Sequence, residues 1–229
     1  IITMVPKSEH SRGVCESILP ALGPGKIYID MSTISPDVSV AISEKVKATG
    51  AQFADCPVVK SRPAALKGEL GIYAGCDEEL FPAIEPVLRY MGSTVLYMGK
   101  NGMGLVMKLC HNTLVAQIQN GVNETLALAN RFGIDAYRFH EAVVCGGAQN
   151  FYLDAQYENL AKEDWTTAFS IENMHKDLGL TLDLAAARGA KLPGAQNAKR
   201  VYDLAMERGF ASSDFRTTFR VVREENEKA

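Results

Sequence analysis

The chain has 229 residues, 47% hydrophobic and 22% charged, a composition that can build one large or two smaller globular domains. Its formal net charge of −3 argues against nucleic acid or an anionic membrane as a partner. Five scattered cysteines without a C-x-x-C pair are typical of reduced thiols in the cytoplasm or another reducing intracellular compartment. No apolar run reaches membrane-spanning length and no signal peptide is visible, so we expect no membrane partner.

The first hundred residues alternate between strand-like and helix-like patterns. Short apolar runs predict strands, and apolar residues at helical spacing predict helices between them. The expected strands cover residues 1–5, 26–31, 51–58, 69–74 and 93–98, and the expected helices cover 8–22, 36–49 and 77–90. This alternation indicates a mostly parallel sheet with helices packed on it.

After Gly99 the pattern is helical only. Helices are predicted at 105–132, 135–144, 171–188, 195–208 and from 213 to about 225. We therefore expect an α/β domain at residues 1–100 and an all-helical domain at 101–229, joined through the long helix. Residues 1–6 resemble a strand in the middle of a fold, so we expect the natural chain to continue upstream of them.

The candidate chemistry centres on the segment GKNGMGLVMKLCHN, residues 99–112. Its helical part places Lys108 and Asn112 at i and i+4, so both side chains share one helix face. A partly desolvated lysine beside an amide can exchange a proton with a substrate hydroxyl. The spacing alone favours the plainer alternative, a solvated lysine and a tolerated asparagine, because such pairs are frequent on helices.

The glycines of this segment, Gly99, Gly102 and Gly104, follow a strand and precede a helix. That is where a phosphate-binding loop can lie, but the spacing matches neither G-x-G-x-x-G nor a P-loop. A tight turn that lets the backbone pass near a substrate is the better interpretation.

Two further segments follow the ends of expected strands, where open α/β sheets bind ligands. Ser32 and Thr33 stand at the first of these ends. Their position is equally compatible with a simple helix cap. Lys60, Ser61 and Arg62 stand in a loop after the second and could bind a carboxylate or a phosphate. A solvated basic loop is the commoner explanation of such a run.

The histidines give no metal-binding spacing, and no Ser/His/Asp set is placed for acyl transfer. His111 lies beside the face of Lys108 and Asn112 and could line the same site. Lys176 and Asp177 lie in a helix with apolar flanks. They can form a buried or interface ion pair, or they can contact a cofactor from the helical domain.

Taken together, these segments resemble the β-hydroxyacid dehydrogenase family, which contains 3-hydroxyisobutyrate dehydrogenase and tartronate semialdehyde (glyoxylate) reductase and is similar to 6-phosphogluconate dehydrogenase. The matching segments occur in the family's order and span nearly the whole chain. They are ITMVP near the start, DMSTISP at 30–36, DCPV at 55–58, the glycine turn into MKLCHN at 107–112, and HKDLGL at 175–180. The resemblance implies a partial Rossmann-type domain followed by a helical domain that forms a homodimer.

The same resemblance implies hydride transfer between NADP or NAD and a small β-hydroxyacid or related carbonyl substrate. Lys108 matches the family's catalytic lysine, and Asn112 matches the asparagine that holds substrate. The implied cofactor-binding positions are Met4, Val5, Pro6, Ser32, Thr33 and Lys176, and the substrate-binding positions are Val59, Lys60, Ser61 and His111.

The chain departs from the family pattern at two places. Where the family's substrate loop has S-G-G, this chain has Val59, Lys60 and Ser61, and valine cannot supply the hydroxyl contact. The first β-α-β unit with G-x-G-x-x-G is missing from the sequence. Two alternatives therefore stand beside the dehydrogenase: a non-catalytic dimerisation or ligand-binding protein derived from such an enzyme, and an imine-reductase-like enzyme.

Overall fold

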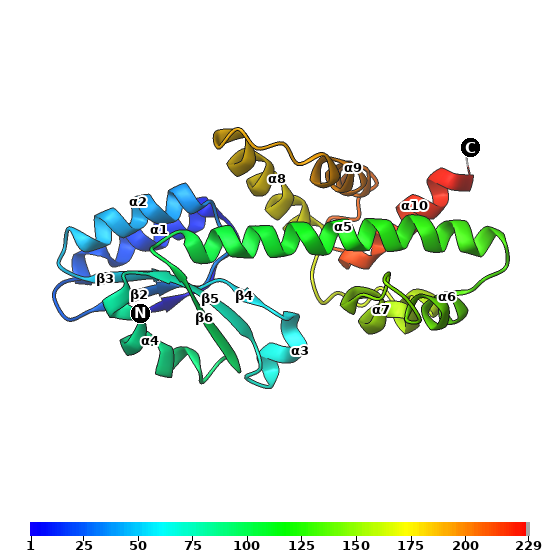
Figure 1. Ribbon diagram of the computed structural model, residues 1–229. Coiled ribbons are helices and arrows are strands. Elements are labelled where there is room, and N and C mark those ends of the chain that lie inside the picture. Colours follow the sequence, from blue (N-terminus) through cyan, green and yellow to red (C-terminus); the bar gives the residue numbers. More distant parts are fainter. Residues whose placement is uncertain (228–229) are drawn as a thin grey trace. The chain divides into compact units, whose positions relative to one another are not determined.

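The computed structural model describes residues 1–227 and divides the chain into two compact units, Ile1–His111 and Asn112–Ala229. The helix α5 (Met103–Arg131) begins in the first unit and ends in the second. Figure 1 shows it as the long green helix. The expected long helix at 105–132 is therefore present, two residues longer at its start and one shorter at its end.

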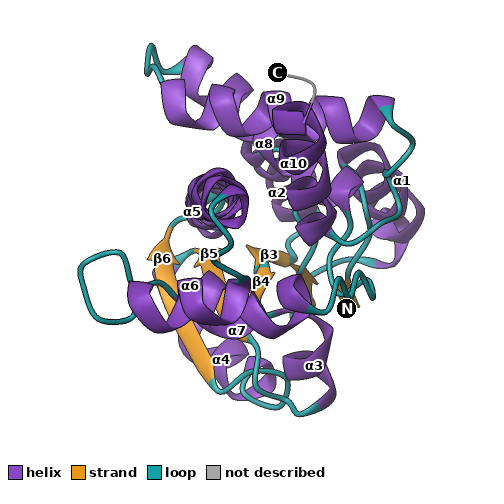
Figure 2. Cartoon of the chain, turned by 90° about the vertical axis from the view of Figure 1, so that its right-hand side faces the viewer, coloured by secondary structure: helices purple, strands orange, loops and turns teal. Residues whose placement is uncertain are grey.

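The first unit contains a sheet whose strands lie in the order β1-β2-β3-β5-β4, with β6 paired to β5. Figure 2 labels β3, β4, β5 and β6 among the orange strands of this sheet. Parallel pairs join β1 to β2, β2 to β3 and β5 to β6, whereas β5 is antiparallel to β3 and β4. The strand bounds are β1 (Ile2–Thr3), β2 (Ile27–Asp30), β3 (Gln52–Asp55), β4 (Val58–Val59), β5 (Gly71–Cys76) and β6 (Thr94–Gly99).

Helices cover this sheet because its strands are apolar on both faces. Successive strand residues point to opposite faces, so Tyr28 and Ile29 enter two different core clusters. Leu105, at the start of α5, packs in the cluster of Tyr28, which attaches the helix to the sheet. The other helices of the unit are α1 (Ser8–Ile18), α2 (Pro36–Lys47), α3 (Ser61–Leu66) and α4 (Phe81–Leu88).

The expected strand at 51–58 is wrong in one respect. It divides at Cys56-Pro57, since proline lacks the N–H that a central strand must donate, and the chain resumes as the two-residue strand β4. The segment expected to be a loop after it forms the short helix α3 instead. In the described residues of this unit, the only helix between β4 and β5 is the six-residue α3, and β5 runs antiparallel to both β3 and β4.

The second unit is helical, with α6 (Ala136–Val143), α7 (Phe151–Ala161), α8 (Ile171–Ala187), α9 (Pro193–Glu207) and α10 (Thr218–Glu227). Helix α7 was not expected from the sequence. Its start is set by Asn150, whose side-chain oxygen accepts a hydrogen bond from the N–H of Leu153 at 2.8 Å. In the described part of the chain, no helix is both long and apolar enough to cross a membrane.

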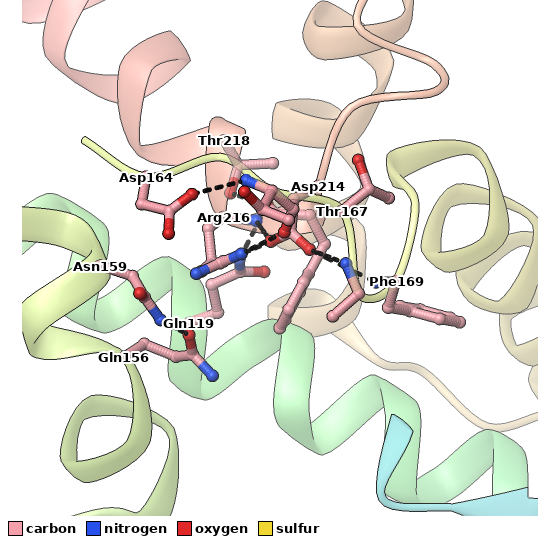
Figure 3. A network of polar contacts seen from close by, with 12 residues as sticks. Gln119, Gln156, Asn159, Asp164, Thr167, Phe169, Asp214, Arg216 and Thr218 are labelled. Atoms are coloured by element: carbon pink, nitrogen blue, oxygen red, sulfur yellow. Dashed lines mark hydrogen bonds and ion pairs between the residues drawn. The ribbon is translucent and has the colours of Figure 1, made fainter. Parts of the chain in front are cut away.

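A buried polar network ties the segment before α8 to the segment before α10 (Figure 3). The Asp214 carboxylate pairs with the Arg216 guanidinium and accepts the N–H of Ala168 at 2.8 Å. Arg216 also donates to the carbonyl oxygen of Thr166 at 2.6 Å. Both charged side chains are almost fully enclosed, so each depends on the other for its charge to be compensated.

Candidate functional site

The first turn of α5 is built around the side chain of Asp55, at the end of β3. One carboxylate oxygen accepts the N–H of Gly102 at 2.6 Å and the side-chain amide of Asn101 at 2.8 Å. The other accepts the N–H of Leu105 at 2.9 Å. An acceptor at this place satisfies N–H groups that the helix start leaves unpaired. The glycine turn therefore holds an internal carboxylate at the place where a phosphate-binding loop would hold its ligand.

The glycines of the turn are required by close packing. A Cβ at Gly104 would lie 2.8 Å from a carboxylate oxygen of Asp55 and even closer to the carbonyl oxygen of Tyr73. A Cβ at Gly75 in β5 would lie 2.8 Å from the backbone nitrogen of Gly104. The backbone of α5 thus approaches Asp55 and β5 as closely as it can. The tight turn expected from the sequence is present, and its nearness to a substrate stays a prediction.

Lys108 lies on the next turn of α5 and is only 7% exposed. His111, three residues on, is half-buried, and its Nδ1 is 3.4 Å from the hydroxyl of Tyr73. Burial lowers the pKa of His111, and the positive charge of Lys108 lowers it further. The first unit therefore places a buried lysine beside a histidine that is favoured in its neutral form.

Asn112 lies one turn beyond Lys108 on the same helix and is 6% exposed. It donates its side-chain amide to Asp177 of α8 at 2.6 Å. The ammonium of Lys176 is 3.1 Å from the other oxygen of Asp177. The ion pair considered for Lys176 and Asp177 is thus present, with Asp177 buried and Lys176 partly exposed. Asp177 links two of the expected site residues.

Five of the six expected cofactor-binding residues, all but Lys176, follow the ends of β1 and β2. Ser32 is buried, its hydroxyl donates to Asp30, and it accepts the N–H of Val5 at 2.8 Å. Around this bond Met4 is 67% exposed, Pro6 is exposed and Thr33 is half-buried. The hydroxyl of Ser32 is used inside the protein, so the outward-facing surface here consists of the neighbouring side chains and the backbone.

The expected substrate-binding residues follow β4. Val59 is half-buried and packs against Gly71, where an added Cβ would lie 2.6 Å from its methyl group. Lys60 and Ser61 are exposed at the start of α3, and Lys60 has a left-handed backbone with φ of 72°. A non-glycine residue in that conformation is uncommon.

Sequence reasoning missed the carboxylates that organise these groups. Asp55 entered only as part of the motif DCPV, Asp30 as part of DMSTISP, and Asp177 as a partner for Lys176. The signal that could have found Asp55 is a carboxylate at a strand end together with a distant glycine-rich helix start. Among residues 1–227, no group of three or more metal-ligating side chains lies close enough to hold a metal ion.

Two family models match the chain. The NAD binding domain of 6-phosphogluconate dehydrogenase matches residues 1–99. The NAD-binding domain of NADP-dependent 3-hydroxyisobutyrate dehydrogenase matches residues 102–222. Together they account for most of the chain.

Individual proteins give the same result. Mitochondrial 3-hydroxyisobutyrate dehydrogenase of Drosophila melanogaster is 31% identical, over 98% of this chain and 72% of that protein. NAD-dependent L-serine dehydrogenase of Pseudomonas aeruginosa is 29% identical, over 94% and 76%. The structure of Mycobacterium tuberculosis 3-hydroxyisobutyrate dehydrogenase with L-serine superposes with a TM-score of 0.89 at 28% identity, covering 97% of this chain and 78% of that one.

Proposed function

The chain belongs to the β-hydroxyacid dehydrogenase family of NAD(P)-dependent oxidoreductases. We propose that it oxidises a small β-hydroxyacid, or reduces the matching carbonyl compound in the reverse direction, with Lys108 as the general base and acid. The observation that carries this proposal is the burial of Lys108 on the first turns of α5, next to His111. Lysine is almost never fully buried unless its charge is paired, so a lysine that is 7% exposed stands in a specific polar environment. A proton donor is needed wherever a carbonyl becomes a hydroxyl.

The residues at the ends of β1 and β2 fit a nicotinamide dinucleotide. The exposed apolar side chain of Met4, flanked by Val5 and Pro6, suits the flat face of an aromatic ring. Thr33 would hold the nicotinamide end from this edge, and Lys176 would contact the cofactor from the helical unit. The cofactor supplies or accepts the hydride.

Proton transfer is the task of the chain's own residues. Lys108 would give its proton to the oxygen of a carbonyl substrate, and would take it back in the reverse direction. The neutral form of His111, favoured by its lowered pKa, adds no second positive charge beside the lysine. Asn112 would hold the substrate's polar groups, with its amide oriented by Asp177.

For the substrate we propose a short hydroxy acid or the matching semialdehyde. The similar proteins are named for 3-hydroxyisobutyrate and L-serine, which both carry a carboxylate and a nearby hydroxyl. Lys60 and Ser61 would bind the carboxylate, as a point charge and a hydroxyl donor, and Val59 would pack against its carbon chain. If so, Val59→Ser should improve kcat/KM for the shortest hydroxy acids, and an unchanged preference would remove Val59 from the site.

We also propose a homodimer in the cytoplasm or another reducing compartment. The exposed side of α5 carries Leu114 and Leu128, 59% and 58% exposed. They are two heptads apart, so they lie on one helix face, where apolar residues suit a partner helix. All five cysteines have free thiols. Analytical ultracentrifugation of the wild type and of Leu114→Glu tests the dimer. We expect a dimeric wild type and a monomeric variant, and a monomeric wild type would rule the dimer out.

The decisive experiment is steady-state reduction of a panel of short semialdehydes by Lys108→Met, with Lys100→Met as the matched control. Lys100 is exposed just before α5. We expect a loss of turnover of roughly 10²–10⁴-fold for Lys108→Met, with cofactor affinity and the melting temperature retained, and little change for Lys100→Met.

Other outcomes contradict the proposal. Near-normal turnover by Lys108→Met would exclude lysine catalysis, and turnover of cyclic imines independent of Lys108 would favour an imine reductase. A wild type that binds NADPH and NADH but reduces no carbonyl would favour the non-catalytic ligand-binding alternative.

A further inference from the structure

Asp55 is a buried carboxylate whose partners all belong to the start of α5. Its exposed fraction is 1%. The three groups that donate to it, the amide of Asn101 and the N–H groups of Gly102 and Leu105, come from residues 46, 47 and 50 positions later in the chain. A single side chain thus determines where the helix begins relative to β3.

The packing around this carboxylate leaves no room for adjustment. An added Cβ at Gly104 would lie 2.8 Å from Asp55, and one at Gly75 would lie 2.8 Å from the backbone of Gly104. Contacts below 3.0 Å are closer than real Cβ atoms adopt. Strands β3 and β5 and the first turn of α5 therefore meet at one point, and any change there must move the helix.

Among the candidate site residues on α5, Lys108 lies nearest to this turn. It follows Leu105 by three residues, which on a helix is a rise of about 4.5 Å. Because a helix is stiff over one turn, a shift of its hydrogen-bonded start carries the lysine along. The ammonium would then stand at a different distance from a bound substrate.

We propose that Asp55 is a positioning residue that sets the place of Lys108 by fixing the first turn of α5 against the sheet. This inference rests on the proposed role of Lys108, while the geometry it describes can be measured without turnover. Asp55 itself takes no part in the chemistry, since its oxygens already bind Asn101, Gly102 and Leu105.

The test uses two variants that disturb the turn and two matched controls. Asp55→Asn places an amide donor against backbone N–H donors, and Gly104→Ala pushes the helix from the strand. The controls are Asp37→Asn, an exposed carboxylate in the first turn of α2, and Gly121→Ala, on α5 itself, where a Cβ meets nothing within 4 Å.

We expect both turn variants to lower kcat roughly ten- to hundredfold, as misplacement of a catalytic group does. The KM for NADPH or NADH should stay within about twofold, since cofactor contacts are not moved. The rate at which acetic anhydride acylates Lys108, relative to Lys100 and followed by mass spectrometry, should rise in both variants and stay unchanged in both controls.

Lower melting temperatures with normal kcat and normal acylation of Lys108 would overturn the proposal, because a purely structural residue predicts that result. If Asp55→Asn does not fold, Asn101→Ala removes only the side-chain donor and should give the same changes to a smaller degree. If Lys108→Met proves active, the proposed function fails, while the acylation rates still decide whether Asp55 places the lysine.

Discussion

Asn112 donates its side-chain amide to Asp177 at 2.6 Å, and this bond determines which end of the amide can serve a ligand. The nitrogen is held by a carboxylate that also pairs with Lys176 at 3.1 Å. The oxygen of Asn112 is therefore oriented as the acceptor. Asn112, expected to bind substrate, and Lys176, expected to bind the cofactor, therefore share Asp177 as a partner.

Replacing Asp177 by Asn should weaken substrate binding more than it weakens folding. The variant cannot accept from Asn112 and pair with Lys176 as the carboxylate does, and a hydrogen bond to a charged group is worth about 1.5–3 kcal/mol. We expect the substrate KM to rise roughly tenfold. Steady-state kinetics measure it, with Asp183→Asn, an exposed residue of the same helix, as the control. An unchanged KM would show that the Asn112 amide needs no orientation.

Removing Arg216 should destabilise the helical unit strongly. Asp214 would remain buried without its cationic partner (Figure 3), a loss that costs about 3–5 kcal/mol. Urea unfolding of Arg216→Met at pH 7 measures this cost. Lys162→Met is the control, because its ion pair with Glu158 is exposed and we expect no measurable change. Equal effects of the two variants would mean that enclosure of the Arg216 pair contributes nothing.

The pKa of His111 should report the charge of Lys108. Burial lowers this pKa first and the nearby ammonium lowers it further, so Lys108→Met should raise it partway toward the ordinary value. A lowered pKa means that, as the pH falls, the unfolded chain takes up a proton on this histidine before the folded chain does. The folded state therefore loses stability as the pH falls below the ordinary histidine pKa of 6.5. NMR titration of the histidine ring signals measures the pKa, with Lys100→Met as control. An unchanged His111 pKa in Lys108→Met would mean that the ammonium of Lys108 does not lie close enough to His111 to affect it.

Asp55 should make stability depend on pH in the opposite sense to an ordinary aspartate. Burial raises its pKa from 3.8 to about 6, against the opposing effect of its hydrogen bonds with Gly102, Leu105 and Asn101. A raised pKa contributes stability that is present below the unfolded value and is lost as the pH rises through about 6. Between pH 4 and 7 the wild type should lose roughly 2 kcal/mol relative to Asp55→Asn. Urea unfolding at both pH values tests it, and a relative gain with rising pH would mean that the hydrogen bonds outweigh burial.

Lys60→Gly should stabilise the first unit. Lys60 has φ of 72°, a conformation that costs a residue with a Cβ about 1–2 kcal/mol and glycine much less. After subtraction of the larger entropy of unfolded glycine, we expect a net gain of up to about 1 kcal/mol. Thermal unfolding measures it. Lys67→Gly, where φ is −100°, should give no gain, and a gain at both positions would point to charge instead of backbone conformation.

Local periodicity and ordered motifs were enough to predict part of this protein. Apolar spacing located the helix that carries Lys108 and Asn112, and helix geometry alone placed both side chains on one face. The motifs from DMSTISP to HKDLGL identified the family, which the comparisons then confirmed. The sequence analysis did not predict α7, whose start depends on a cap by Asn150. It also did not predict the direction of β5, which depends on strand pairing.

The carboxylates that bind the helix of Lys108 and Asn112 could be identified from the folded chain alone. Asp55 meets the start of α5 across 47 positions of sequence, and Asp177 meets Asn112 across 65. No periodic pattern encodes such partners, because the energy of a buried carboxylate depends on the donors that the fold brings to it. The sequence predicted Lys108 and Asn112 as the residues for the chemistry, and the fold shows that Asp55 and Asp177 are the carboxylates that bind their helix.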